Sequence, residues 1–417
     1  MKKMMLGCLS ALGAVLTLAG AAPATPKIEI APSRESGMAR CGETGKFKIT
    51  VRDKKGEPLT SGRVICAFSD ERFRPLAEST HDLAGGNPFE AGLVMENPGF
   101  LRCTARIDGS SAFAVIAFEP EKIVSGQPAP ADFKDFWMQE KTAALKLPLD
   151  VKLEPLARIS TPEYTGYAIS FANVGGGRMY GYLSVPTGTG PFPAGITLPG
   201  AGPGFSAPSG DYPFESTIVL TLNIHPYPVE PETAKERYEE LNREEFYYFH
   251  GLPEIRNYVF YKAFMGICRG IRYLTERSDW DRRNLQVWGS SQGGALTIAA
   301  AALNPETVTA AAVNVPGMCE LVPGFRGPRD NWEKIMARPE GPALLPYFDM
   351  CHFAPLIRCP MIWSVALRDE SCYPHSVYAA YNCVTAPKFL WVTPWMGHAF
   401  DPAYTDFRRQ WLVQQLR

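Results

Sequence analysis

A Gly-Ser-Ser-Gln-Gly pentapeptide at residues 289–293 is the feature that most constrains the fold of this chain. An apolar run at 285–288 leads directly into it, and an alanine-rich stretch follows it as far as Asn304-Pro305. A strand, a sharp turn and a helix in this order form a nucleophile elbow, in which the two glycines let the backbone bend and expose the central serine. The pattern therefore predicts an α/β sheet with Ser291 as a nucleophile at the end of a strand. The alternative is a tight loop with a structural serine.

A serine hydroxyl is a weak nucleophile at neutral pH and needs a histidine base that is itself oriented by an acid. Folds built around this elbow place the three in the chain order Ser, acid, His. His398 follows the apolar run 389–392, and Asp369 follows the apolar run 361–367. Both side chains would then emerge at the carboxyl edge of the sheet, on the side of the elbow. We predict His398 as the base and Asp369 as the acid.

Other residues compete for these two roles. Of the six histidines, only His352 and His375 also follow the elbow; we expect the first to pack in a loop and the second to face a pocket mouth. Asp349 precedes the strand that should carry the acid, and Glu370 is the closer rival.

A nucleophilic serine of this kind also needs donors aimed at a developing oxyanion. The backbone N–H of Gln292, directly after the serine, is one predicted donor. The second should come from the loop after the early strand 194–198. Pro199 has no N–H, so Ala201 is the predicted donor in that loop.

Five apolar runs with little alternation indicate strands buried on both faces, and helical stretches such as 257–276 separate some of them. They predict a catalytic domain over residues 130–417 with a mostly parallel sheet flanked by helices. Segment 319–345, rich in Pro, Gly and charge, is expected to form a loop or lid whose Phe325 and Trp332 shape the acyl site. The five runs are 194–198, 218–222, 285–288, 309–315 and 361–367.

The N-terminal part has a different pattern. Between residues 25 and 123, short strands with alternating apolar residues are separated by turns, which predicts a small all-β sandwich of immunoglobulin type. A Pro/Gly-containing linker at 125–130 follows it. Residues 27–118 contain no Trp and no Tyr, the rings on which sugars stack, so we expect a structural or spacer role for this module.

Residues 1–24 are predicted to be a signal peptide. Lys2 and Lys3 precede an apolar region at 5–18, and small residues at 19–24 offer a cleavage site. A buried N-terminal helix and a lipoprotein attachment at Cys8 are the alternatives, although Cys8 precedes most of the apolar region. We therefore expect a secreted or periplasmic protein.

The 42 basic and 43 acidic residues give a formal net charge of −1, which argues against a nucleic-acid partner. No apolar run reaches the roughly 20 residues of a membrane-spanning helix, so no membrane span is predicted.

Ten cysteines leave nine after the predicted cleavage, an odd number that requires a free thiol. Cys66 and Cys103 each lie in a predicted strand with alternating apolar residues, and both side chains are expected to point into the same core. They are therefore the pair most suited to a disulfide. A zinc site could be suggested by the group Cys351, Cys359, Cys372, Cys383 and His375. However, the half-site formed by Cys372 and His375 has no second half-site at ligand spacing, so neither zinc nor any other metal or cofactor is predicted.

From Pro130 onward the chain resembles the acetylxylan esterase and cephalosporin C deacetylase family of α/β-hydrolases. The resemblance implies an α/β-hydrolase fold, a serine esterase that removes acetyl groups from xylo-oligosaccharides and small esters without a metal, and a homo-oligomer. The family's catalytic residues correspond to the triad predicted above. The matching segments are 130–137, 181–183 with 191–194, 289–303 and 347–349.

Three signatures of the family are replaced in this chain, and the replacements bear on substrate choice and on the oligomer. Pro199-Gly200-Ala201 stands for His-Gly-Tyr, Asn223-Ile224-His225 stands for Arg-Gly-Gln, and His398-Ala399 stands for His-Glu.

We therefore expect a serine esterase acting on acetylated carbohydrate or another small ester. One alternative is a serine peptidase of the prolyl oligopeptidase type, although the small β module does not fit its access-limiting domain. The other is a noncatalytic carbohydrate-binding or scaffold protein that retains the fold.

Overall fold

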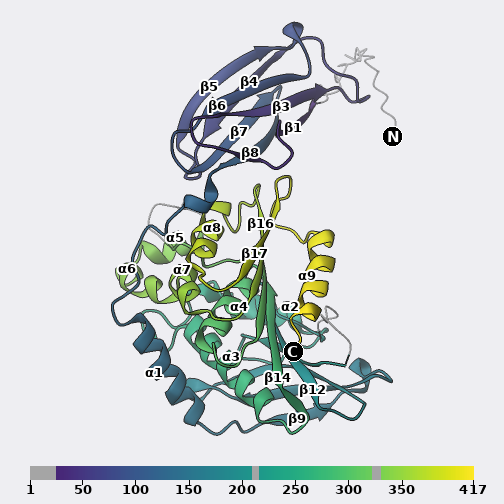
Figure 1. Cartoon of the computed structure of the whole chain (residues 1–417), viewed down its shortest axis with the longest axis vertical. Helices are drawn as coiled ribbons and strands as arrows, with labels where there is room; N and C mark the ends of the chain where they lie inside the picture. The colour runs from purple at the N-terminus through teal and green to yellow at the C-terminus, as the bar shows by residue number, and fades with distance from the viewer. Residues whose placement is uncertain (1–24, 209–215, 322–329) are drawn as a thin grey trace, which may run out of the picture.

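The computed structural model describes residues 25–208, 216–321 and 330–417. The predicted signal peptide at 1–24 lies outside these residues. An all-β module at the N-terminal end stands on a larger α/β domain, at the edge where β16 and β17 lie (Figure 1). None of the helices in the described ranges has the length and apolar character needed to cross a membrane.

The N-terminal module is a two-layer β-sandwich. One sheet has the order β1-β3-β6 and the other β2-β8-β7-β4-β5. Along β3 the exposed and buried residues alternate, and Phe47, Ile49 and Val51 point into the core between the sheets. This distribution of strands between two sheets is that of an immunoglobulin-type sandwich, as predicted. The strands are β1 Lys27–Pro32, β2 Met38–Ala39, β3 Thr44–Arg52, β4 Arg63–Ser69, β5 Pro75–Asp82, β6 Phe89–Val94, β7 Gly99–Ile107 and β8 Ser110–Phe118.

The predicted disulfide between Cys66 and Cys103 is wrong, because both are free thiols in the structure. The two residues do lie buried on neighbouring strands of one core, as expected. However, Cys66 is opposite Ala105, and Cys103 is opposite Phe68, so the cysteines are diagonal rather than facing. Diagonal neighbours are roughly 7–8 Å apart at the backbone, beyond the usual span of a disulfide. A hydrogen bond between the thiols raises the pKa of Cys103.

The α/β domain contains a nine-stranded sheet with the order β17-β16-β15-β14-β12-β13-β11-β10-β9. The six strands from β17 to β13 are parallel, and β11, β10 and β9 continue the sheet in antiparallel pairs. The predicted apolar runs coincide with the parallel strands. The strands are β9 Lys152–Pro155, β10 Tyr164–Ala172, β11 Arg178–Pro186, β12 Phe192–Leu198, β13 Ile218–Asn223, β14 Trp280–Ser290, β15 Ala310–Asn314, β16 Met361–Ala366 and β17 Lys388–Thr393.

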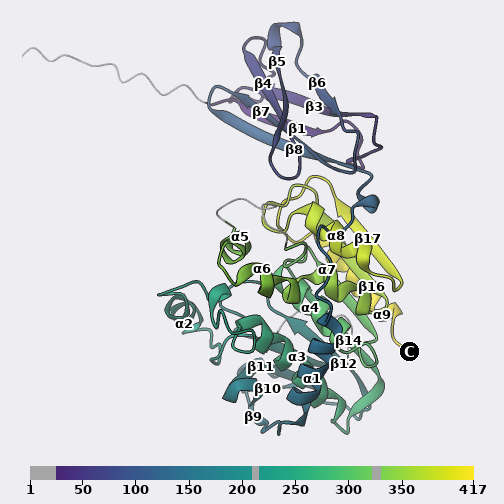
Figure 2. The same ribbon diagram turned by 90° about the vertical axis from the view of Figure 1, so that its left-hand side faces the viewer.

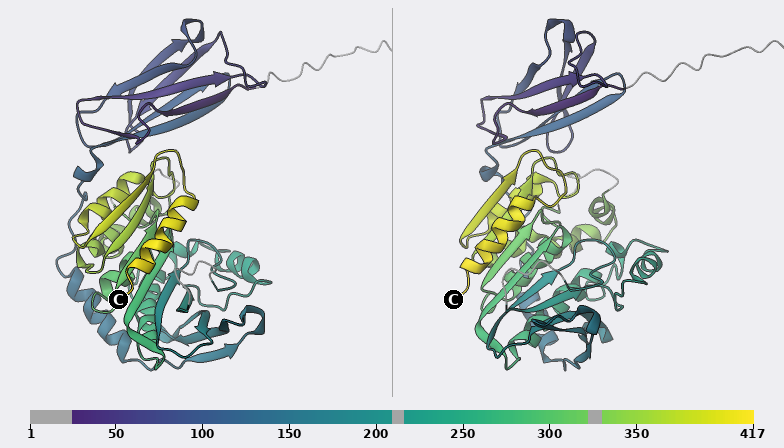
Figure 3. Two further views of the ribbon diagram at one scale, coloured as in Figure 1. Left: turned by 45° about the vertical axis from the view of Figure 1, so that its right-hand side comes forward. Right: turned by 90° about the vertical axis from the view of Figure 1, so that its right-hand side faces the viewer.

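Helices cover both faces of this sheet. On β15, Ala311 and Val313 belong to the large core shared with α3, α4 and α8, whereas Ala310 and Ala312 pack with Tyr404 of α9. Successive strand residues point to opposite faces, so α9 lies on the face of the sheet opposite the one that α4 covers. Figure 3 shows α9, in yellow, lying against the sheet. The helices are α1 Phe133–Lys146, α2 Ala234–Leu241, α3 Val259–Thr275, α4 Gln292–Leu303, α5 Asn331–Met336, α6 Gly341–Leu344, α7 Met350–Phe353, α8 Pro374–Cys383 and α9 Pro402–Gln414.

Candidate active site

The pentapeptide forms the predicted sharp turn between β14 and α4. Ser291 has φ 57° and ψ −123°, a conformation that non-glycine residues rarely adopt. A Cβ atom on Gly289 would lie 2.4 Å from the carbonyl oxygen of Gly293, and one on Gly293 would lie 2.3 Å from that of Leu198. Only glycine fits at these two positions, which explains why this spacing marks the turn.

The structure brings Ser291, His398 and Asp369 together. The Oγ of Ser291 is 3.0 Å from Nε2 of His398, and Nδ1 of that histidine is 2.8 Å from Oδ2 of Asp369. Asp369 follows β16, and its other oxygen accepts the backbone N–H groups of Ser371 and Cys372, each at 2.8 Å. The carboxylate is therefore fixed on both sides, with one oxygen aimed at the histidine.

His398 lies in the loop after β17, with 31% of its side chain exposed. The hydrogen bond to Asp369, followed by one with Cys372, raises the pKa of His398, and burial opposes this effect. Cys372 is a neighbour that sequence reasoning assigned no role. Its Sγ is 4.0 Å from Oγ of Ser291, and its position three residues after the acid was the available signal.

The rival residues lie elsewhere. His352 bonds to the carbonyl oxygens of Pro346 and Gln127, and Asp349 accepts the backbone N–H groups of residues 320, 321 and 351. His375 faces the β module, 3.8 Å from Glu71. The carboxylate of Glu370 pairs with Arg102 of the module at 2.6 Å. None of these four contacts the serine hydroxyl in the described part of the chain.

The two predicted oxyanion donors belong to segments that are tied together by the Gln292 side chain. Its Nε2 donates to the carbonyl oxygens of Pro199 and Gly200, both at 3.3 Å. The hydroxyl of Tyr247, which is fully buried, donates to its Oε1 at 2.5 Å. Tyr247 thus stabilises the position of the Ala201 loop relative to the elbow.

Asn223 and His225, which replace a family signature, hold the other end of the same loop. The amide of Asn223 exchanges two hydrogen bonds with the backbone of Phe205, at 2.7 and 2.9 Å. Nε2 of His225 donates to the carbonyl oxygen of Gly202 at 2.8 Å, and burial lowers the pKa of this histidine. The replacement residues therefore support the loop that carries the predicted donor.

Two cavities meet at the serine. Both are lined by Ala201, Ser291 and His398, and their volumes are about 400 and 560 Å³. Trp332, which was expected to shape the acyl site, lies in the wall of the larger cavity. Phe325 lies outside the described residues. The larger cavity also has Tyr248, Tyr373, Asp330 and Asn331 in its wall, and the smaller one has Phe205, Trp288 and Phe400.

Two groups of side chains in the described ranges have the donor types of a metal site. One is Asp369, Cys372 and His398, and the other is Glu320, Asp349 and Cys351. The donor atoms of the second group bond to protein groups: Asp349 accepts backbone N–H groups, and the thiol of Cys351 contacts Glu320 at 3.4 Å. The first group is the hydrogen-bonded set around the serine.

A family model described as acetyl xylan esterase matches residues 119–323 and 325–415. The acetyl esterase Axe7A of Xylanibacter ruminicola is 31% identical over 339 residues, which cover 78% of this chain and 76% of that protein. The acetyl xylan esterase 1 structure from Thermoanaerobacterium sp. JW/SL YS485 superposes with a TM-score of 0.59 at 20% identity, over 71% of this chain and 98% of that one. The acetyl xylan esterase of Paenibacillus sp. R4 gives 0.58 at 19% identity, with the same coverages. The predicted resemblance and the α/β-hydrolase fold are confirmed.

Proposed function

Because the chain belongs to the acetyl xylan esterase family and is thereby a carboxylic ester hydrolase, we propose that it deacetylates xylo-oligosaccharides or related carbohydrate esters through an acyl-enzyme at Ser291. The observation that carries this proposal is the pair of hydrogen bonds, 3.0 and 2.8 Å long, that link Ser291 to His398 and His398 to Asp369 at the end of a nucleophile elbow.

The proposed reaction has two steps. Oγ of Ser291 attacks the ester carbonyl while Nε2 of His398 takes its proton, and the N–H groups of Ala201 and Gln292 hold the resulting oxyanion. The bond to the sugar oxygen then breaks, and His398 returns the proton to that oxygen. A water molecule activated by the same histidine hydrolyses the acetyl-serine. Asp369 keeps the proton of His398 on Nδ1 throughout, which leaves Nε2 free to accept.

The wall of the larger cavity supports a sugar as the leaving group. Trp332, Tyr248 and Tyr373 offer rings against which a sugar face can stack, and Asp330 and Asn331 offer hydrogen-bond partners for hydroxyl groups. We propose that the sugar lies on this side of Ser291. A signal peptide at 1–24 would place the enzyme outside the cytoplasm, where such polymer fragments are met.

A substrate panel tests the proposal. We expect turnover of acetylated xylo-oligosaccharides and p-nitrophenyl acetate, with kcat/KM falling as the acyl chain lengthens, and no turnover of peptide anilides above background. A preference for the anilides would support the peptidase alternative instead. Absence of turnover with every ester would support the noncatalytic alternative.

The pH profile depends on His398, which must be neutral to accept the serine proton. Its neighbours with titratable groups are Asp369 and Cys372, and the bond to Asp369 raises the pKa of His398. A raised pKa moves the acid limb of the profile to higher pH. As the pH is lowered, kcat/KM for p-nitrophenyl acetate should therefore begin to fall while the pH is still above about 6.5, the ordinary pKa of histidine. An acid limb centred well below that value would contradict the assigned geometry.

Replacing Tyr247 with phenylalanine should lower kcat by about 10-fold and change KM little, because small misplacements of catalytic groups are costly. The variant leaves Oε1 of Gln292 without the donor that fixes it, so the Ala201 loop loses its anchor. Tyr258→Phe is the matched control, since this hydroxyl is buried but has no hydrogen-bond partner among the described residues. Equal kcat values for the two variants would exclude the anchoring role.

A further inference from the structure

The β-sandwich module lies against the loops that carry two of the proposed catalytic residues. We infer that it is a positioning element of the active site, and that Arg102 holds the acid loop, residues 367–373, so that Asp369 meets His398. This inference rests on the proposed function of the triad. The family model begins at residue 119, so the strands of the module lie outside the region that this model matches.

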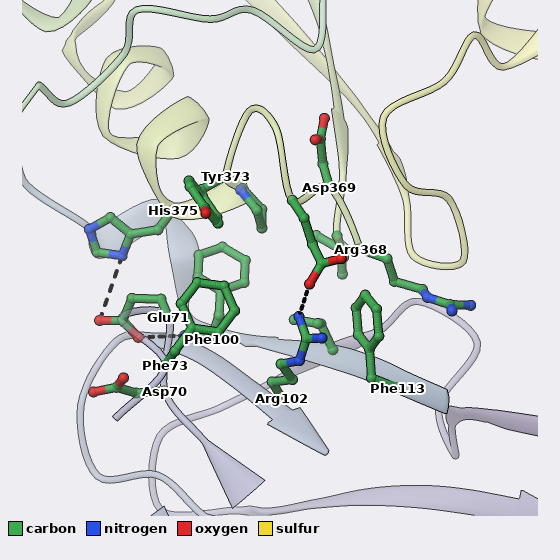
Figure 4. A pocket seen from close by; sticks show the side chains of 14 residues that line it. Asp70, Glu71, Phe73, Phe100, Arg102, Phe113, Arg368, Asp369, Tyr373 and His375 are labelled. Atoms are coloured by element: carbon green, nitrogen blue, oxygen red, sulfur yellow. Dashed lines mark hydrogen bonds and ion pairs between the residues drawn. The ribbon is translucent and has the colours of Figure 1, made fainter. Parts of the chain in front are cut away.

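A pocket between the two domains shows the contact (Figure 4). Its module wall comes from the turn after β4 and from β7 and β8, and its other wall is the acid loop with the start of α8. Arg102 and Phe113 rise from the module toward this loop, and the carboxylate of Asp369 points away from the module. Figure 2 shows the same stacking of the module on the ends of β16 and β17.

Arg102 makes an ion pair between the two domains. Its Nη1 lies 2.6 Å from Oε1 of Glu370, the residue directly after Asp369, and only 19% of the arginine side chain is exposed. Its guanidinium also stacks on the ring of Phe113 at 3.5 Å. Arg368 of the acid loop also lies near this ring, with its guanidinium carbon 4.9 Å from the ring centre. The residues on both sides of Asp369 are therefore held by Arg102 and Phe113 of the module.

Aromatic contacts extend this interface along the loop. The rings of Phe73 and Tyr373 meet edge to face at 5.7 Å, and His375 at the start of α8 lies near Phe100, at 6.2 Å, and near Glu71. Because Tyr373 and Glu370 also line the larger active-site cavity, the module supports part of the substrate wall as well.

The module also contacts the histidine loop, residues 394–401, which joins β17 to α9 and carries His398. A Cβ on Gly37, which has φ +66°, would lie 2.9 Å from Cβ of Pro394 and 3.0 Å from Cδ1 of Leu367. Pro394 directly follows β17 and leads toward His398, and the backbone N–H of Arg368 donates to the carbonyl oxygen of Met396 at 3.0 Å. The acid loop and the histidine loop are thus bonded to each other and are both packed against the module.

These contacts explain why the module can act on catalysis without touching substrate. Arg102 does not line either active-site cavity, so its effect would pass through the position of the acid loop. A displacement of about 1 Å in a catalytic group can lower a rate by roughly 100-fold. The Arg102 side chain lies in the pocket between the domains, and methionine keeps much of its apolar stem, so its replacement should leave the fold of both domains in place.

The test compares Arg102→Met with the full-length wild-type protein. We expect kcat for p-nitrophenyl acetate to fall by about 5- to 20-fold with KM unchanged within about 2-fold, because the substrate wall remains while the acid is loosened. The acid limb of the pH profile should move toward lower pH, since a weakened bond to Asp369 raises the pKa of His398 less. Arg102→Lys, which keeps the charge beside Glu370, should recover part of kcat.

Arg106→Met is the matched control, because Arg106 lies four residues along β7 and is exposed. Should Arg102→Met fail to fold, the same measurements are made on Phe113→Leu. The inference would be overturned if the measured variant kept the wild-type kcat and an unmoved acid limb, or if its loss were confined to KM. Such a result leaves the proposed esterase function intact, because that function is tested by the wild-type substrate panel and by replacement of Ser291.

Discussion

Replacing Ser291 with alanine is expected to lower kcat/KM for p-nitrophenyl acetate by about 10⁴-fold or more. Removing the nucleophile of a serine triad ends the covalent route, and the residual rate comes from the oxyanion donors and from substrate binding alone. The pre-steady-state burst of p-nitrophenol should disappear with it, because no acyl-enzyme can accumulate. Stopped-flow release of the phenol measures both quantities.

The fold should survive this replacement. Alanine keeps the Cβ of serine and loses only the Oγ contacts, 3.0 Å to His398 and 4.0 Å to Cys372. The backbone hydrogen bond from residue 291 to the carbonyl oxygen of Asn314, 2.9 Å long, is unaffected. The thermal midpoint should therefore stay within a few degrees of the wild type. Ser278→Ala, an exposed serine just before β14, is the activity control.

A fluorophosphonate probe gives a second measurement. It should label the wild type and the Ser278→Ala variant, and it should not label Ser291→Ala. Burst kinetics or labelling retained in the Ser291→Ala variant would show that another residue is the nucleophile, and the proposed mechanism would fall.

Local sequence patterns were sufficient to predict the parallel sheet and the three residues that meet at its edge. The glycines at 289 and 293 are required by close backbone contacts, so their spacing carries direct steric information. Runs of apolar residues mark strands buried on both faces, and the carboxyl ends of parallel strands share one edge. His398 and Asp369 could be placed because each follows such a run.

The residues that sequence reasoning missed act through contacts between distant segments. Tyr247 reaches Gln292 across 45 positions, and Arg102 reaches Glu370 across 268. Neither pair has a periodic or spacing signal, because each depends on how two finished elements pack. The disulfide failed for a related reason: alternation showed that both cysteines face one core, but it could not fix the register that makes them diagonal.

Replacing Asp369 with asparagine is expected to lower kcat by about 10⁴-fold while leaving the fold unchanged. Oδ1 of Asp369 accepts two backbone N–H groups, and an asparagine would keep its own oxygen there. Its NH₂ group would then face Nδ1 of His398 and donate to it, which forces the proton of the neutral imidazole onto Nε2. A protonated Nε2 cannot accept the proton of Ser291, so the base is lost even though every heavy atom remains in place.

Kinetics across pH separate this effect from unfolding and from the rival acid. The residual activity of Asp369→Asn should show its acid limb at lower pH than the wild type, because the bond to the carboxylate raises the pKa of His398 and is absent in the variant. Glu370→Gln should lose at most about 10-fold in kcat, since the carboxylate of Glu370 pairs with Arg102 rather than with His398. If Glu370→Gln instead lost the larger factor and Asp369→Asn kept most of its activity, Glu370 would be the acid, and the hydrogen bond between Asp369 and His398 would have no catalytic role.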